Sequence, residues 1–272
     1  MTQAQLAADT VSEAPRLSRR WVVLGGRILL AILLLLAWEI GARRLGSVFL
    51  SPPLQVGARI VELARSGQLF TDALATLRVS ALGFVITTVV GVLLPFLLRS
   101  SLRVTRAVEP YIMATMGIPK YALAPWLILW FGIGDAPKLV VVALMVFYIV
   151  FITTSAGVRA VDPRLVNMAR IAGASETVIS REIIWKSLLP FFFTGLKVAL
   201  PRAVSATIVG EFLVAGEGIG HYIEHSRQMS DPVGVFAGIV VATALVLAIN
   251  AAVNAIERRA LSWRPVEREM EL

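Results

Sequence analysis

The sequence predicts an all-α integral membrane protein with six transmembrane helices. Of its 272 residues, 57% are hydrophobic and 16% are charged, and the mean hydropathy is +0.77. A soluble domain usually has about a quarter charged residues. Several apolar runs approach the roughly 20 residues that a helix needs to cross a bilayer. The composition therefore excludes an ordinary soluble enzyme.

Residue counts exclude several kinds of functional site. The chain has no cysteine, so it has no disulfide, no thiolate zinc site and no cysteine nucleophile. Two histidines leave few ligands for a metal centre, and we expect no metal site. The formal net charge of +8 comes from basic residues that lie between apolar runs. This distribution is typical of a membrane protein, and no nucleic-acid partner is expected.

The chain divides into a transmembrane domain and two tails. Residues 1–21 are expected to form an N-terminal tail, residues 22–259 the transmembrane domain, and residues 260–272 a C-terminal tail. Six stretches of the domain are apolar enough to span a membrane. Their approximate limits are 22–42, 79–98, 108–131, 139–158, 188–213 and 233–256.

The first span, Val22–Ala42, is rich in Leu and Ile. A cleaved signal peptide is the alternative, but the apolar run is long and no small-residue cleavage site follows it. Prolines at 52 and 53 then break the chain, and Leu54–Arg65 is amphipathic. This segment is too short and too charged to span, so we expect it to lie at the membrane interface.

The later spans are limited by basic or polar residues. The second span ends at Arg99, and a polar stretch, residues 159–187, separates the fourth span from the fifth. The third span contains Pro119 and Pro125. A proline inside a helix removes a backbone hydrogen bond and kinks the helix, so a kinked third span is expected. The sixth span ends at the pair Arg258-Arg259.

The distribution of Lys and Arg predicts the orientation. With the N-terminus in the cytoplasm, 15 of the 26 basic residues fall in cytoplasmic segments and seven in outer segments. Short cytoplasmic loops carry the excess of Lys and Arg in membrane proteins. Both termini are therefore expected to be cytoplasmic, although Arg43-Arg44 is a local exception.

The long loop between the fourth and fifth spans has the pattern of two short helices. Asp162 followed by Pro163 is a typical helix start. Gly173 can end that helix in a left-handed conformation, and Ser175 can cap the next one through its hydroxyl. The pattern predicts a compact cytoplasmic knob, defined here as residues 163–186. A simple turn between two spans is the alternative.

The knob and several other motifs resemble a known family. Its residues are similar to the "EAA" loop of the membrane subunit of binding-protein-dependent ABC importers, and the other motifs are similar to the nitrate/sulfonate/taurine branch. The resemblance covers about residues 50–260. The motifs are Ala169, Gly173, Ala174 and Ser175 in the loop, Leu189-Pro190 and Thr194–Lys197 after it, and Leu50–Pro53, Ile118–Pro125, Leu129–Gly134, Val209–Glu211 and Gly218–Gly220 elsewhere.

Two positions depart from the family pattern. Asn167-Met168 replaces the Glu-Ala that begins the loop motif, and Trp185-Lys186 stands where the branch usually has Leu-Pro. The glycine and the helix pattern remain, so the docking role is expected to persist. The path of the second short helix is left open.

The resemblance implies a function, a set of partners and a location. It implies a permease subunit, in the inner membrane of a bacterium, that works with two cytoplasmic ATPase subunits, an extracytoplasmic solute-binding protein and a second copy of itself. The solute would be a small anion such as a sulfonate, taurine or nitrate, or a pyrimidine precursor or aromatic acid. The residues expected to couple this chain to the ATPase are Pro163, Ala169, Arg170, Gly173, Ala174, Ser175 and Glu176.

The sequence has no nucleotide-binding loop of its own. The P-loop pattern G-x-x-x-x-G-K-[ST] is absent, and the glycines at 216–220 have no strand before them, which favours a turn. We therefore expect no cofactor in this chain, with ATP and Mg²⁺ bound by the partner ATPase. The chain is expected not to be an enzyme. His221, Glu224 and His225 could bind a metal only on a helix, and a solvated loop is favoured there.

Ionisable residues within the spans are candidates for a solute pathway. At about 100° per residue, Lys197 and Glu211 fall within some 40° of one face of the fifth span, with Val204 and Ile208 between them. The alternative places both charged groups at the headgroup levels. Lys120, in the kinked third span, could favour an anion or pair with a free carbonyl.

A stand-alone secondary transporter or channel is the rival interpretation. It would use Lys120, Lys197 and Glu211 as coupling or selectivity residues and would need no ATPase. It would also have no use for a helical knob in the cytoplasm. Changing Ala169–Ser175 separates the two, because only an importer should lose transport.

Overall fold

The computed structural model describes residues 16–46, 49–99, 101–214 and 216–260, and it consists of two units, residues 1–58 and 59–272. Every regular element in the described residues is helical, which confirms the predicted all-α class. Residues 1–15 of the expected N-terminal tail and residues 261–272 of the C-terminal tail lie outside the described residues.

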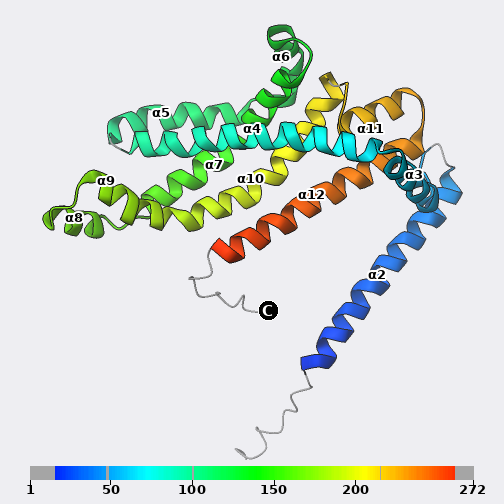
Figure 1. The fold of residues 1–272 in the computed structure, drawn as a ribbon, viewed down its shortest axis with the longest axis horizontal. Helices are drawn as coiled ribbons and strands as arrows, with labels where there is room; N and C mark the ends of the chain where they lie inside the picture. The colour runs from blue at the N-terminus through cyan, green and yellow to red at the C-terminus, as the bar shows by residue number, and fades with distance from the viewer. Residues whose placement is uncertain (1–15, 47–48, 100, 215, 261–272) are drawn as a thin grey trace, which may run out of the picture. The chain divides into compact units, whose positions relative to one another are not determined.

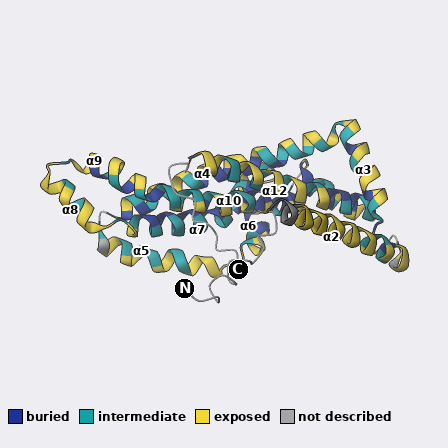
Figure 2. Cartoon of the chain, turned by 90° about the horizontal axis from the view of Figure 1, so that it is seen from below, coloured by how far each residue is buried: buried dark blue, intermediate teal, exposed yellow. Residues whose placement is uncertain are grey.

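The first unit contains one long helix and the start of a second. Helix α2, Arg16–Leu45, includes the predicted first span and ends in its basic pair, where Glu39 accepts a hydrogen bond of 2.7 Å from Arg43. Its large apolar side chains from Trp21 to Leu36 are exposed (Figure 2). An apolar surface of this length fits the hydrocarbon of a bilayer. Helix α3, Pro53–Ser66, is the predicted amphipathic segment and runs into the second unit.

The second unit contains the remaining helices (Figure 1). Two short 3₁₀ turns, Thr115–Gly117 and Lys120–Leu123, and a π-helical turn, Ile179–Ile184, connect some of them. The helices are α4 Gln68–Leu98, α5 Leu102–Ala114, α6 Ala124–Phe131, α7 Asp135–Arg159, α8 Pro163–Ile171, α9 Glu176–Val178, α10 Trp185–Val214, α11 Ile219–Gln228 and α12 Pro232–Ala260.

Five helices in the described residues are long and apolar enough to cross a membrane, or six spans result if the bent pair α5 and α6 counts as one. The spans cover the predicted ones, but α4 begins at Gln68, eleven residues before the predicted start. Those extra residues carry Asp72, Thr76 and Arg78.

The third predicted span is broken, which goes further than the expected kink. Its two halves meet at 84°. Pro119 disfavours helical geometry at the residue before it, and Ile118 is extended with φ −70° and ψ 127°. Pro125 does not interrupt a helix, because it lies in the first turn of α6, where a missing N–H costs nothing.

Helices α4, α7 and α10 enclose the hydrophobic core, with Val142, Val146 and Val150 of α7 at its centre. Two glycines let α4 approach α7. A Cβ at Gly83 would lie 2.7 Å from Val142 Cγ1, and one at Gly91 would lie 2.9 Å from Val150 Cγ1. Small residues at helix crossings permit this approach in membrane proteins, where packing drives helix association.

Candidate functional site

The first helix of the knob begins as its sequence predicts. The carboxylate of Asp162 accepts a hydrogen bond of 2.8 Å from the Arg164 backbone N–H, and Pro163 is the first residue of α8. An acidic cap followed by proline satisfies a free N–H and presets the first turn. The helix start is therefore independent of any partner.

The end of α8 is a glycine cap. Gly173 has a φ of +79°, its N–H donates to Arg170 at 3.0 Å, and the next N–H, of Ala174, donates to Ala169 at 2.9 Å. This pair of bonds is the Schellman motif, which favours glycine at the left-handed position. Ser175 then accepts from the Val178 N–H at 3.4 Å. The predicted helix, glycine cap and second helix start are all present.

One edge of the knob is apolar and exposed. Leu165, Met168 and Ile171 follow one another at intervals of three residues along α8, and Ile171 is 90% exposed. An ion pair of 2.8 Å joins Arg170 to Glu176 across the glycine turn. Exposed apolar rows rimmed by charge are typical of protein-binding surfaces.

Trp185-Lys186, which differs from the family's Leu-Pro, does not interrupt the helical backbone. From Glu176 the backbone passes through the π-helical turn directly into α10. The ring of Trp185 lies 6.0 Å from that of Phe96, and Lys186 pairs with Glu182 at 2.5 Å. The second short helix is thus continuous with a membrane span.

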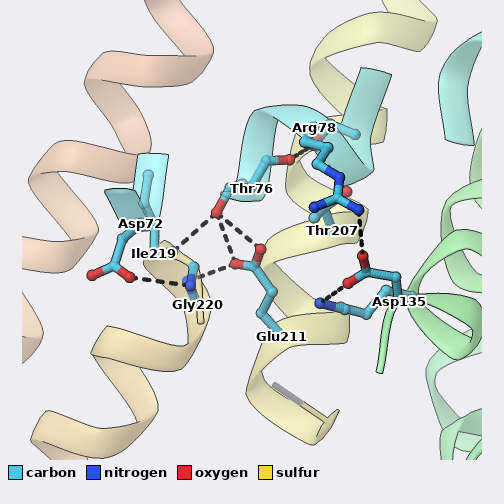
Figure 3. Close-up of polar contacts among 11 residues, drawn as sticks. Asp72, Thr76, Arg78, Asp135, Thr207, Glu211, Ile219 and Gly220 are labelled. Atoms are coloured by element: carbon cyan, nitrogen blue, oxygen red, sulfur yellow. Dashed lines mark hydrogen bonds and ion pairs between the residues drawn. The ribbon is translucent and has the colours of Figure 1, made fainter. Parts of the chain in front are cut away.

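A second site is a buried carboxylate on α10. Glu211 is 1% exposed, and its two oxygens accept hydrogen bonds of 2.9 and 3.0 Å from the Thr76 hydroxyl of α4 (Figure 3). The backbone N–H of Gly220, on α11, donates to the same carboxylate at 2.8 Å. A buried carboxyl group requires such partners, because burial removes its hydration.

The carboxylate site caps the N-terminus of α11. Asp72 accepts from the N–H of Gly218, the residue before the helix, at 3.2 Å, and the first two N–H groups of the helix donate to Thr76 at 2.9 Å and to Glu211 at 2.8 Å. Negative side chains are favourable at the positive end of a helix dipole. Gly218 has a φ of +108°, and a Cβ at Gly220 would lie 2.7 Å from the Glu211 Cβ. A side chain at either position would therefore clash with Glu211, and the positive φ at position 218 also favours glycine.

Polar side chains extend this site across three helices. Ser80 donates to Thr207 at 2.9 Å, which links α4 to α10. On α7, the buried ammonium of Lys138 pairs with Asp135 at 2.6 Å, and Arg78 lies 3.8 Å from the same carboxylate. Asp72 and Thr76 were not expected from the sequence. Their signal was a polar pair four residues apart, just before the apolar run of α4.

Residues 83–262 match the family described as the inner membrane component of binding-protein-dependent transport systems. The chain belongs to this family. The match confirms the predicted resemblance, and the sulfonate/taurine-type branch agrees with the names of its relatives.

Two relatives and one solved structure show the extent of the similarity. The formylaminopyrimidine transport permease ThiX of Halalkalibacterium halodurans is 35% identical over 86% of this chain and 93% of its own. The putative aliphatic sulfonates transport permease SsuC of Bacillus subtilis is 28% identical over 94% and 93%. A chain of the inward-facing MetNI methionine ABC transporter, 20% identical, superposes with a TM-score of 0.59 over 71% of this chain and 94% of that one.

Family membership shows that this permease is not itself an enzyme. Permease subunits of ABC importers are not enzymes, and the ATPase activity lies in a partner subunit. The family also implies a solute-binding partner. The chain is thus a transport component in the inner membrane, with several apolar helices.

The candidate pathway residues differ in burial and in their polar partners. Val204 and Ile208 are buried in helix packing on the same helix as Glu211. Lys197 is half exposed and pairs with Glu257 of α12 at 3.1 Å. Lys120 donates to the Met116 carbonyl at 3.1 Å and lies 4.9 Å from the centre of the Tyr148 ring. That these residues line a pathway stays a prediction.

The expectation of a solvated loop around His221 is wrong, because the segment forms helix α11. The segment has no capping side chain of its own, and residues of α4 and α10 cap the start of the helix instead. The two histidine rings lie 6.0 Å apart, but Glu224 between them bonds to Arg227 at 2.6 Å. The hydrogen bonds from Arg227 and, to a lesser extent, from Gln228 lower the pKa of Glu224 to about 2. No group of three metal-ligating side chains occurs in the part of the chain that the structure describes.

Proposed function

We propose that this chain forms the translocation pathway of an ATP-driven importer, as one of two identical permease subunits. Two ATPase subunits bind at the knobs, and a solute-binding protein delivers the solute from the other side. The observation that carries the proposal is the exposed apolar row of Leu165, Met168 and Ile171 on a helix that is capped at both ends. Such a helix is preformed for docking, so little ordering entropy opposes binding.

The proposed topology has six spans, with α5 and α6 together forming the third. The transmembrane domain covers residues 22–259, and the tails 1–21 and 260–272 lie in the cytoplasm, as the excess of Lys and Arg on that side predicts. The knob lies on the same side. This places its apolar row where a cytoplasmic ATPase can reach it.

The knob is built to transmit movement to the spans. Its second half continues into α10 through the π-helical turn, and Arg99, at the end of α4, donates a hydrogen bond of 2.6 Å to Ser180 of the knob. A displacement of the knob therefore acts on two packed spans together. Closure of the ATPase dimer would rock these spans as a rigid body. ATP and Mg²⁺ bind to the partner, and the permease itself needs no cofactor.

The solute is a small nutrient of the pyrimidine-precursor type, with a sulfonate as the second candidate. The relative named for formylaminopyrimidine transport is 35% identical to the chain, and the one named for sulfonates is 28% identical. Lys197 is paired with Glu257, so it offers no free cation to an anionic solute, whereas the acceptor bound by Lys120 is a neutral carbonyl. The pairing of Lys197 argues against the rival secondary transporter, which would rely on that charge.

Uptake by reconstituted vesicles tests this proposal. The permease, its ATPase and its binding protein are incorporated, and uptake of a labelled aminopyrimidine and a labelled alkanesulfonate is followed with and without ATP. We expect ATP-dependent uptake of the aminopyrimidine, and its loss when residues 169–175 are scrambled although the protein still inserts. ATP-independent uptake that survives the scramble would support the secondary transporter instead.

A further inference from the structure

A cavity of about 650 Å³ lies where α4 and α7 end, and it is separate from the carboxylate site. Helix α5 and the start of the knob form its other walls. Arg99 directly follows α4, and Arg159 is the last residue of α7. Both residues end apolar spans, so the mouth of the cavity lies at the level of the lipid headgroups.

The mouth of this cavity is strongly basic. Four arginines and a single acidic residue, Glu109, line it. Two of the arginines are neutralised, because Arg159 pairs with Glu109 at 2.9 Å and Arg170 pairs with Glu176 at 2.8 Å. Among the described residues, the neutral Ser180 hydroxyl, at 2.6 Å, is the only hydrogen-bond partner of the Arg99 guanidinium. The Arg106 side chain has no hydrogen bond or ion pair to another described residue. Two positive charges therefore remain at the mouth.

The interior of the cavity is mainly apolar, although Ser155 also lines its α7 wall, and it extends along the spans. Pro95 precedes Arg99 by four residues and Phe151 precedes Arg159 by eight, and both line the cavity. At 1.5 Å per residue, the wall extends about 6 Å along α4 and about 12 Å along α7 from the charged level. An inorganic anion would occupy only the charged mouth and would leave the apolar wall uncovered. A molecule with a charged head and an apolar tail fills both parts.

We infer that this cavity binds an anionic phospholipid, with its phosphate between Arg99 and Arg106 and the start of an acyl chain along Pro95 and Phe151. Guanidinium groups match phosphate oxygens in geometry and charge. Basic pockets between membrane helices at the cytoplasmic face are typical sites for such headgroups. A bound lipid contacts α4, α5 and the knob together, so it stabilises their arrangement.

Native mass spectrometry of the full chain tests the site. The chain is purified in detergent and titrated with phosphatidylglycerol or with phosphatidylcholine of the same acyl chains. Arg106→Gln removes an arginine that has no internal partner among the described residues, so the fold is undisturbed. The matched control is Arg103→Gln, on the same helix, exposed, and outside the cavity.

We expect the wild type to retain phosphatidylglycerol in preference to phosphatidylcholine. Arg106→Gln should weaken this retention about fivefold, Arg106→Glu should weaken it further, and Arg103→Gln should leave it unchanged. Equal retention of the two lipids, or equal weakening by Arg103→Gln, would overturn the inference. A parallel thermal melt with inorganic phosphate separates the sources: protection by phosphate equal to that by the lipid would mean a free-anion site and would also overturn it.

Discussion

Two glycine turns of this permease have opposite surroundings. Gly173, in the knob, and Gly218, before α11, both have positive φ and both precede a helix start. At Gly218 the carboxylate of Glu211 fills the space where a side chain would stand, whereas nothing lies within 4 Å of the Gly173 position. The turn at Gly218 is closed by the protein's own residues, whereas the turn at Gly173 is open to its surroundings.

The difference extends to the side chains around each turn. Near α11, every polar group of Glu211 and Thr76 has a partner inside the chain. In the knob, the helix caps are satisfied internally but the apolar row that ends at Ile171 is exposed. Changes at the carboxylate site should therefore act on stability, and changes on the knob should act on association.

The largest effect on stability is expected from Glu211→Ala. The substitution leaves the Thr76 hydroxyl and the Gly220 N–H buried without their acceptor, at about 1–3 kcal/mol for each group. We expect a fall of about 2–6 kcal/mol in the free energy of unfolding, seen as a lower melting temperature in detergent. Glu217→Ala, at an exposed position, is the control. Similar melting of both variants would remove the distinction between the two turns.

A smaller loss is expected from Gly83→Val, in the crossing of α4 and α7. The new side chain would meet Val142, and overpacking of this kind costs about 1–3 kcal/mol. The control is Gly25→Val on α2, where nothing lies within 4 Å. Thermal unfolding of both variants measures the effect, and a stable Gly83→Val protein would show that the crossing is looser than described.

Gly173→Val should act locally. A branched residue in the left-handed conformation costs about 1–2 kcal/mol, so the end of α8 should fray while the melting temperature of the whole chain stays unchanged. Hydrogen exchange of the Ala174 amide measures this, with Gly173→Asn as the conservative variant because asparagine tolerates the conformation. A global fall in stability would mean that the knob is part of the folded core.

The smallest effect is expected from Asp231→Asn. The Arg59–Asp231 ion pair, 2.6 Å long, is one-third exposed, and pairs of this kind contribute about 0–1 kcal/mol. Asparagine can still accept the Gly234 N–H that Asp231 accepts at 3.1 Å. We expect a melting temperature within about 2 °C of the wild type. A drop as large as that of Glu211→Ala would contradict the ranking of buried over exposed pairs.

The sequence predicted the parts of the fold that depend on local signals. Asp162-Pro163, Gly173 and Ser175 carry their own cap chemistry, so the two helix starts and the turn were predictable. Apolar length was enough to place the spans. Proline in the third span predicted a kink, but the break at Pro119 and its 84° angle were not predicted.

The carboxylate site could not be predicted in this way, because its capping residues come from other helices. Helix α11 has no cap within its own sequence, and its N–H groups find Asp72 and Thr76, which lie more than 140 residues earlier in the chain. Helical periodicity placed Lys197 and Glu211 on one face but could not show that Glu257 and Thr76 would bind them. Long-range pairing is invisible to a local pattern.

Co-purification of the ATPase with the permease tests the role of the knob most directly. Ile171→Asp places a charge on the 90% exposed end of its apolar row, and Ile133→Asp does the same at an 85% exposed isoleucine outside the knob. We predict that Ile171→Asp weakens retention of the ATPase by at least about 30-fold, as expected for an apolar anchor of an interface, with unchanged melting, while Ile133→Asp retains it. Equal retention of the ATPase by both variants would contradict the assignment of the knob as its docking surface.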